Sequence, residues 1–92
     1  MRIPLGGDGQ GDIASRKEVV IGRGADCDVV VKDVKASRRH CRLTRMEGGD
    51  GFTLEDLDSR NGTYVNGKRV EGSVALTANQ TFKIGDTIFY LA

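Results

Sequence analysis

The chain has 92 residues, with 14 basic and 13 acidic side chains and a formal net charge of +1. This length suits a single domain spanning residues 1–92, near the lower limit for an adequate core without disulfides or metal. The balance of charge argues against a nucleic-acid binder or a membrane-surface protein, because such domains usually carry a clear basic excess.

In chain order, short apolar runs bounded by Gly, Asn and Asp predict strands, and no window of eleven residues shows a helical period. A Gly-rich stretch over residues 6–12 predicts a flexible loop after the first strand. With no Trp and few other aromatic residues, the core is expected to consist mainly of Val, Ile and Leu. The pattern indicates an all-β sandwich or barrel. The predicted strands span residues 1–5, 19–21, 27–32, 38–46, 52–55, 74–76, 81–84 and 87–91, with a further short one around Val70.

Turn residues separate these runs. Residues 48–51 form a Gly-rich cluster that predicts a hairpin loop, and Gly85-Asp86 predicts the turn between the last two strands. The dipeptides Asn61-Gly62 and Asn66-Gly67 suit the positive-φ positions of tight hairpin turns. For Asn66 a purely turn-forming role is at least as good an explanation as a functional one.

The two cysteines, Cys27 and Cys41, are too few for a secreted disulfide scaffold. Cys41 lies in an alternating run and is expected to be a small buried apolar residue, with a disulfide to Cys27 as the alternative. Neither a metal site nor a cofactor is expected, because these cysteines and His40 lack tetrahedral ligand spacing. The sequence shows neither a signal peptide nor a segment of transmembrane length, so a cytoplasmic protein is expected.

Arg23 follows the strand at 19–21 directly and is flanked by Gly22 and Gly24. This placement lets the guanidinium project from the end of a sheet. Arginine is the side chain best suited to bidentate phosphate binding, because its planar fork matches two oxygens. Taken alone, an arginine at such a position is more often a solvated loop charge.

Two further loops add donors and cations. Ser37 offers a hydroxyl, and Asn61 offers an amide that can donate and accept hydrogen bonds. His40 lies at the start of an alternating run, where a structural hydrogen bond is a simpler role than catalysis. The basic side chains close to Ser37 and Asn61 are Lys35, Arg38, Arg39 and Arg60. By themselves the first three could simply protect a strand edge from pairing.

The order and spacing of these residues resemble the forkhead-associated (FHA) domain. The matching motifs are Gly22-Arg23, Ser37-x-x-His40 and Ser59-x-Asn61-Gly62-Thr63, and the resemblance runs from about Val19 to Leu91. It implies an antiparallel β-sandwich of about eleven short strands, whose loops at one end bind phosphothreonine peptides. The N-terminal segment matches the family pattern least well.

The resemblance also implies a role for each matching residue. Lys35 would read the third residue after the phosphothreonine, with a preference for an acidic one, and Asn61 would hold the peptide main chain. The phosphate would be bound by Arg23, Ser37, Arg38 and Arg60, and the site would be supported by Gly22, His40, Gly62 and Thr63. The expected partner is a phosphothreonine-containing protein, bound by a monomer in phosphorylation-dependent signalling.

Three alternatives remain open from the sequence. An enzyme using Ser37 and His40 is disfavoured, because residues three apart on an extended chain point to opposite faces. A small nucleic-acid-binding β domain is suggested by the basic stretch at 35–42, but residues 30–46 contain no aromatic side chain for base stacking. The third alternative is an FHA-like module that binds its partner independently of phosphate.

Overall fold

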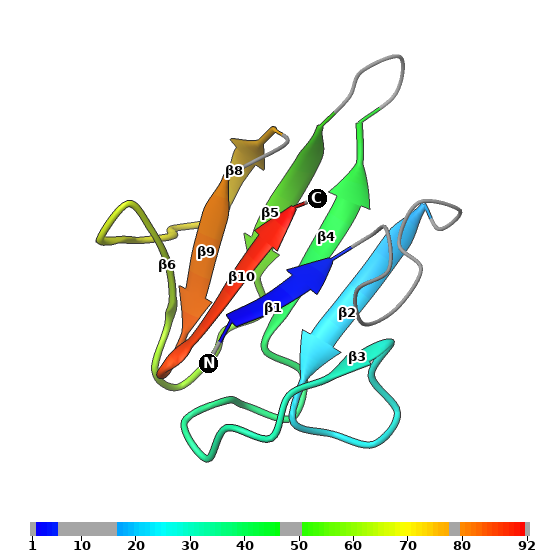
Figure 1. Ribbon diagram of the computed structural model, residues 1–92, viewed down its shortest axis with the longest axis vertical. Helices are drawn as coiled ribbons and strands as arrows, with labels where there is room; N and C mark the ends of the chain where they lie inside the picture. The colour runs from blue at the N-terminus through cyan, green and yellow to red at the C-terminus, as the bar shows by residue number, and fades with distance from the viewer. Residues whose placement is uncertain (1, 6–16, 47–50, 78–79, 92) are drawn as a thin grey trace.

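A computed structural model describes residues 2–5, 17–46, 51–77 and 80–91 (Figure 1). Within these ranges the chain forms strands and turns, and no helix is long and apolar enough to cross a membrane. The described residues contain ten strands, where the family resemblance implies about eleven. They are β1 Arg2–Leu5, β2 Glu18–Gly22, β3 Val29–Val30, β4 Cys41–Arg45, β5 Phe52–Asp56, β6 Thr63–Val65, β7 Lys68–Arg69, β8 Ser73–Leu76, β9 Thr81–Ile84 and β10 Thr87–Leu91.

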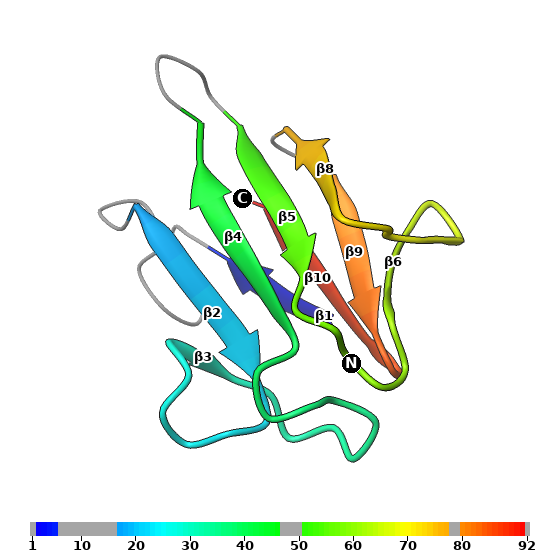
Figure 2. The same cartoon turned by 180° about the vertical axis from the view of Figure 1, so that it is seen from behind.

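The strands form two five-stranded sheets that face each other, as Figures 1 and 2 show from opposite sides. The first sheet has the order β1-β10-β9-β6-β7, and the second has the order β3-β2-β4-β5-β8. Pairing is antiparallel except at two edges, where β1 runs parallel to β10 and β3 runs parallel to β2. The predicted β-sandwich is therefore confirmed.

The core lies between the two sheets and follows the alternation in the sequence. The β2–β4–β5 register aligns Val19 with Leu43 and Leu43 with Leu54, and all three side chains are buried. From the first sheet, Phe82 and Phe89 stack with ring centroids 5.0 Å apart. Cys41 is fully buried in the same core, as the alternating pattern predicted, and both cysteines are free thiols.

Two predicted strands are shorter in the structure. The strand predicted at 38–46 begins only at Cys41. Before it, the carbonyl of Arg38 accepts the backbone N–H of Gly24 in a neighbouring loop, so it does not pair with a strand. The run predicted at 27–32 pairs only at Val29–Val30. Residues 38–40 of the first run, and residues 27–28 and 31–32 of the second, lie in loops.

The two Asn-Gly dipeptides differ. Asn66 and Gly67 have φ values of 52° and 78° and form the tight β6–β7 turn, as predicted. The prediction of a hairpin at Asn61-Gly62 is wrong: only Gly62 has a positive φ, and the segment joins strands of different sheets. The predicted loops at 6–12 and 48–50 lie outside the described residues.

Several loops meet at the lower end of the molecule in Figure 1. They are the segments after β2 and before β4, the β5–β6 connection and the β9–β10 turn. Hydrogen bonds join them: Arg23 N–H donates to Ser37 O, Asn61 Nδ2 donates to Lys35 O, and Asp86 N–H donates to Asp33 Oδ2. The sandwich therefore brings together the loops in which the sequence places its concentrated polar chemistry.

Candidate functional site

The loop after β2 fixes Arg23 against the loop that carries Ser37. The Arg23 backbone N–H donates to Ser37 O over 2.9 Å, and Arg23 Nε donates to Ala36 O over 3.0 Å. The side chain is otherwise exposed, so both terminal guanidinium nitrogens can reach an external ligand. The neighbouring Gly22 has no room for a side chain, because a Cβ there would lie 2.2 Å from the carbonyl oxygen of Arg38. Glycine is needed here for close approach of two backbones.

His40 holds the Ser37 loop to the β5–β6 loop. Its Nδ1 accepts the backbone N–H of Ser37 at 3.0 Å, and its Nε2 lies 2.8 Å from Gly62 O. An accepting Nδ1 and a carbonyl partner at Nε2 require the neutral tautomer with the proton on Nε2. Burial lowers the pKa of His40 below its ordinary value, which favours this neutral form.

The β5–β6 loop is organised around the carboxylate of Asp56. Oδ1 accepts the hydroxyls of Ser59 at 2.5 Å and Thr63 at 2.8 Å, and Oδ2 accepts the backbone N–H of Ser59 at 3.1 Å. Ser59 Oγ in turn accepts the backbone N–H of Gly62. Burial by itself raises the pKa of Asp56, but these hydrogen bonds outweigh it, and the pKa lies below the ordinary value. The loop that presents Arg60 and Asn61 is thus fixed from beneath.

Arg60 and Asn61 then bond directly to the second loop. The Arg60 backbone N–H donates to Ser37 Oγ over 3.0 Å, and Asn61 Nδ2 donates to Lys35 O over 2.8 Å. The Ser37 hydroxyl proton and the Asn61 side-chain oxygen stay available to a ligand, since these bonds use neither. The arrangement offers donors and cations beside a side-chain amide at one exposed surface.

A second carboxylate ties Lys35 to the β9–β10 turn. Asp33 accepts the backbone N–H groups of Lys35 and Asp86 and the hydroxyl of Thr87, each at 2.9 Å. These hydrogen bonds, from Lys35 first and Asp86 next, lower the pKa of Asp33. Lys35 Nζ lies 3.3 Å from Asp86 Oδ2, an exposed ion pair that places a carboxylate next to the ammonium group.

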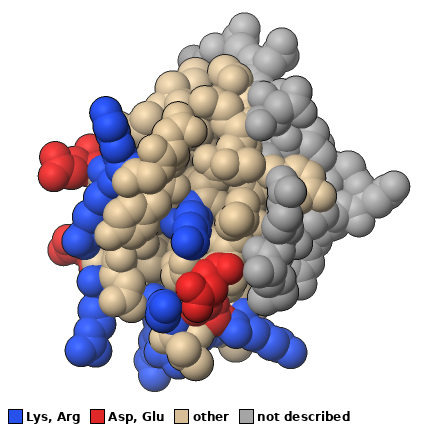
Figure 3. All heavy atoms as spheres, turned by 60° about the vertical axis from the view of Figure 1, so that its left-hand side comes forward, with Lys and Arg blue, Asp and Glu red and all other residues tan. Residues whose placement is uncertain are grey.

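The exposed end formed by these loops carries several exposed basic side chains. Arg23 and Arg38 line a surface hollow of about 440 Å³, together with Gly24, Ala25 and Asp26. Basic side chains gather at this lower end in Figure 3, with acidic ones among them. Such a cluster of guanidinium, hydroxyl and amide groups can bind a multivalent oxyanion through several charge-assisted hydrogen bonds. Among the described residues, no three His, Cys, Asp or Glu side chains are grouped to hold a metal ion.

The structure brings most of the predicted site residues into one network. Direct hydrogen bonds join the loops of Arg23, Lys35, Ser37, His40 and the segment 60–62. Thr63 lies one layer beneath, on Asp56. Arg38 is exposed beside Arg23, and its carbonyl accepts the Cys27 thiol at 2.9 Å. Whether these groups bind phosphate remains a prediction.

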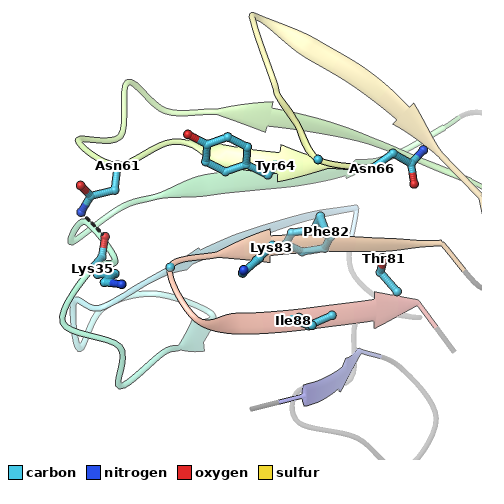
Figure 4. A pocket seen from close by; sticks show the side chains of 10 residues that line it. Lys35, Asn61, Tyr64, Asn66, Thr81, Phe82, Lys83 and Ile88 are labelled. Carbon is cyan, nitrogen blue, oxygen red and sulfur yellow. Dashed lines mark hydrogen bonds between the residues drawn. The ribbon is translucent and has the colours of Figure 1, made fainter.

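Sequence reasoning missed the two organising carboxylates. The spacing of Asp56, Ser59 and Thr63 could have indicated the first, because aspartate readily accepts hydrogen bonds from residues just after it. No local signal could have indicated that Asp33 bonds the backbone of Asp86, 53 residues later. Tyr64 and Lys83 were also missed; they line a groove next to Lys35 and Asn61 (Figure 4).

Comparison with known proteins agrees with this geometry. The family described as "FHA domain" matches residues 19–85. The FHA domain-containing protein FhaB of Mycobacterium tuberculosis is 39% identical over 77 residues, which cover 84% of this chain and 48% of FhaB. The chain spans about half the length of that relative.

Solved structures show the same fold. The FHA domain of the CT664 protein from Chlamydia trachomatis superposes with a TM-score of 0.73 at 32% identity, over 78% of this chain and 72% of that one. Mycobacterium tuberculosis EmbR, in complex with a low-affinity phosphopeptide, gives a TM-score of 0.72 at 30% identity. The match to EmbR covers 87% of this chain and 22% of that protein.

Proposed function

The chain belongs to the FHA-domain family, and we propose from this that it is a phosphopeptide-binding module that recognises phosphothreonine in a partner protein. In this proposal the interaction is switched on by a kinase, because an unphosphorylated hydroxyl offers Arg23 no anionic partner. The EmbR structure supports the proposal, since that related fold was solved with a phosphopeptide. The expectations of a monomer and of a cytoplasmic location stay predictions.

The observation that carries the proposal is the convergence of Arg23, Ser37 and Arg60 from three loops. The loops of Arg23 and Arg60 both bond to Ser37, one through its carbonyl and the other through its hydroxyl. A phosphate monoester carries about −1.5 to −2 charge and three acceptor oxygens. We assign its oxygens to the Arg23 guanidinium, the Ser37 hydroxyl, and donors from Arg38 and Arg60.

The affinity expected from these contacts is moderate. About four charge-assisted hydrogen bonds at about 1.5–3 kcal/mol each give about 6–12 kcal/mol of gross attraction. Loss of translational freedom and ordering of a flexible peptide oppose this by several kcal/mol. With added main-chain contacts from Asn61, we expect a binding free energy of about −8 kcal/mol, which corresponds to a dissociation constant in the micromolar range.

Binding also explains Ser37 and His40 better than catalysis does. The two residues are joined through the Ser37 backbone N–H, and the other imidazole nitrogen faces the carbonyl of Gly62. The described contacts of the imidazole thus leave the hydroxyl unactivated, whereas a serine nucleophile needs its base within hydrogen-bonding reach of the hydroxyl oxygen.

The test is an NMR titration of the ¹⁵N-labelled chain with a degenerate phosphothreonine peptide pool, beside its unphosphorylated counterpart. We expect phosphate-dependent shifts at the amides of Arg23, residues 37–39 and residues 60–61. Equal shifts with both pools, or none in these loops, would overturn phosphate recognition and favour binding through another surface. Phosphoserine peptides, run in parallel, measure the preference for threonine.

A further inference from the structure

We propose that a groove on the outer face of the first sheet binds the segment that flanks the phosphothreonine in the same partner, and that it selects apolar and acidic side chains there. This inference rests on the proposed function and extends it. The groove has a volume of about 590 Å³, and its lining includes Lys35, Asn61, Tyr64, Thr81, Lys83 and Ile88 (Figure 4).

Strand register places the floor of the groove on one face. Tyr64 of β6 is paired with Lys83 of β9, and Lys83 is paired with Ile88 of β10. Directly paired residues share a face of the sheet. Because Phe82 and Ile84 on either side of Lys83 are buried in the core, Lys83 and its two partners face outward. Tyr64 and Ile88 are half-buried there, and they supply apolar surface beside an ammonium group.

One end of the groove lies next to the loops of the candidate phosphate site. Asn61 and Lys35 line this end, and a hydrogen bond joins them (Figure 4). The Tyr64 ring lies against Gly62, since a Cβ built on that glycine would be 3.2 Å from a ring carbon. A peptide held by Asn61 therefore meets the groove directly as it leaves the phosphate-binding loops.

Charge and size define the occupant. Lys83 is exposed, and no carboxylate of the described residues is paired with it. Lys35, at the end of the groove, is already paired with Asp86. A carboxylate of the partner should therefore gain more binding free energy from an ion pair with Lys83 than from one with Lys35. The volume falls within the range of about 300–1,000 Å³ that is typical of ligand sites. It suits a few side chains of an extended segment, alternately apolar toward Tyr64 and Ile88 and acidic toward Lys83.

The experiment compares a core peptide with extended ones. The core is phosphothreonine with three residues on each side, and two longer peptides add four alternating Leu and Glu residues at the N- or the C-terminal end. Fluorescence anisotropy gives each dissociation constant. We expect one extension to tighten binding about tenfold over the core, about 1.4 kcal/mol. The same extension with Lys in place of Glu should give no such gain.

Variants locate the effect. Lys83→Glu and, separately, Tyr64→Ala should each abolish most of the gain from the extension while leaving the affinity for the core peptide within twofold. Lys17→Glu is the matched charge control, because Lys17 is exposed and precedes the other sheet at the end of β2 remote from Arg23. The Lys83 variant changes an exposed side chain and keeps the test valid if the Tyr64 variant is unstable.

The outcomes separate the two proposals. If the core peptide binds with phosphate but neither extension gains affinity, or if the gain survives both groove variants, the groove proposal is overturned and the proposed function stands. If the core peptide does not bind at all, both are overturned. Amide shifts at Tyr64, Lys83 and Ile88, seen only with the extended peptide, would support binding in the groove.

Discussion

The backbone N–H of Arg60 donates a hydrogen bond of 3.0 Å to the side-chain oxygen of Ser37, 23 residues earlier in the chain. A serine hydroxyl has one proton to donate and two lone pairs to accept. The bond uses a lone pair, so it orients the hydroxyl while its proton remains free for an external acceptor. It also couples the loop of Arg60 to the loop that Arg23 holds.

Replacement of Ser37 by alanine should therefore weaken phosphopeptide binding with little loss of stability. One hydrogen bond to a charged acceptor contributes about 1.5–3 kcal/mol, which corresponds to about 10- to 100-fold in affinity. Because Arg60 is exposed, its backbone N–H can form a hydrogen bond with water when the Ser37 hydroxyl is removed. Calorimetric titration of Ser37→Ala and Ser37→Thr with one phosphopeptide measures the effect. Unchanged affinity in the alanine variant would remove Ser37 from the phosphate contacts.

Arg23→Ala should remove most phosphate-dependent binding. Two charge-assisted hydrogen bonds would be lost, about 3–6 kcal/mol or more than a hundredfold. The melting temperature should change by only a few degrees, because the side chain is exposed. Arg39→Ala is the matched control for net charge, since Arg39 is exposed in the same basic region. Equal losses in the two variants would mean that general charge, and not the Arg23 position, drives binding.

His40→Ala should destabilise the fold. The substitution leaves the Ser37 N–H and the Gly62 carbonyl unpaired and opens a cavity at a fully buried position. We expect a loss of about 2–4 kcal/mol, seen as a fall in melting temperature of about 10 °C or more. His40→Gln, which keeps one donor and one acceptor, should recover part of it. An unchanged melting temperature together with lost binding would instead make His40 a direct contact.

Stability should fall as the pH is lowered through 6.5. The pKa of His40 is lowered by burial in the folded state, so the unfolded chain binds a proton near pH 6.5 that the folded chain does not. The free energy of unfolding then decreases by up to about 1.4 kcal/mol per pH unit. Asp33 and Asp56, whose pKa values lie below 3.8, add a second loss as the pH falls through 3.8.

Urea denaturation at pH 7.5, 6.5, 5.5, 4.5 and 3.5 measures this dependence. The His40→Gln variant should lack the loss between pH 7 and 5, while any loss below pH 4.5 persists. A wild-type stability that stays constant from pH 7 to 5 would contradict the neutral, hydrogen-bonded imidazole.

The ion pair of Lys35 with Asp86 should weaken any preference for acidic residues near the phosphothreonine. Asp86→Asn removes the competing carboxylate, so discrimination between Asp and Ala at the third residue after the phosphothreonine should increase. Because exposed ion pairs contribute at most about 1 kcal/mol, the change should stay within about fivefold. Lys35→Glu should reverse the preference toward basic residues. Peptides that carry Asp, Ala or Lys at that position, measured against all three proteins, test this, and indifference to both variants would exclude Lys35 from peptide recognition.

Local patterns were enough for much of the fold. Alternation predicted the strands and the buried Cys41, and Asn66-Gly67 and Gly85-Asp86 marked the turns between paired neighbours. The prediction failed at Asn61-Gly62, where the same dipeptide joins two sheets. A hairpin needs consecutive strands that pair, and local sequence does not specify that pairing.

The all-β class, the apolar faces and the ordered family motifs could therefore be predicted from the sequence, because each depends on residues close together in the chain. Other features are seen only in the folded chain: which loops meet, that Asn61 bonds Lys35, that Asp33 bonds the Asp86 backbone, and that Tyr64 and Lys83 share a groove. These relationships join residues 19 to 53 positions apart. They depend on the order of strands in two packed sheets, which is set by burial of the whole core and not by any single segment.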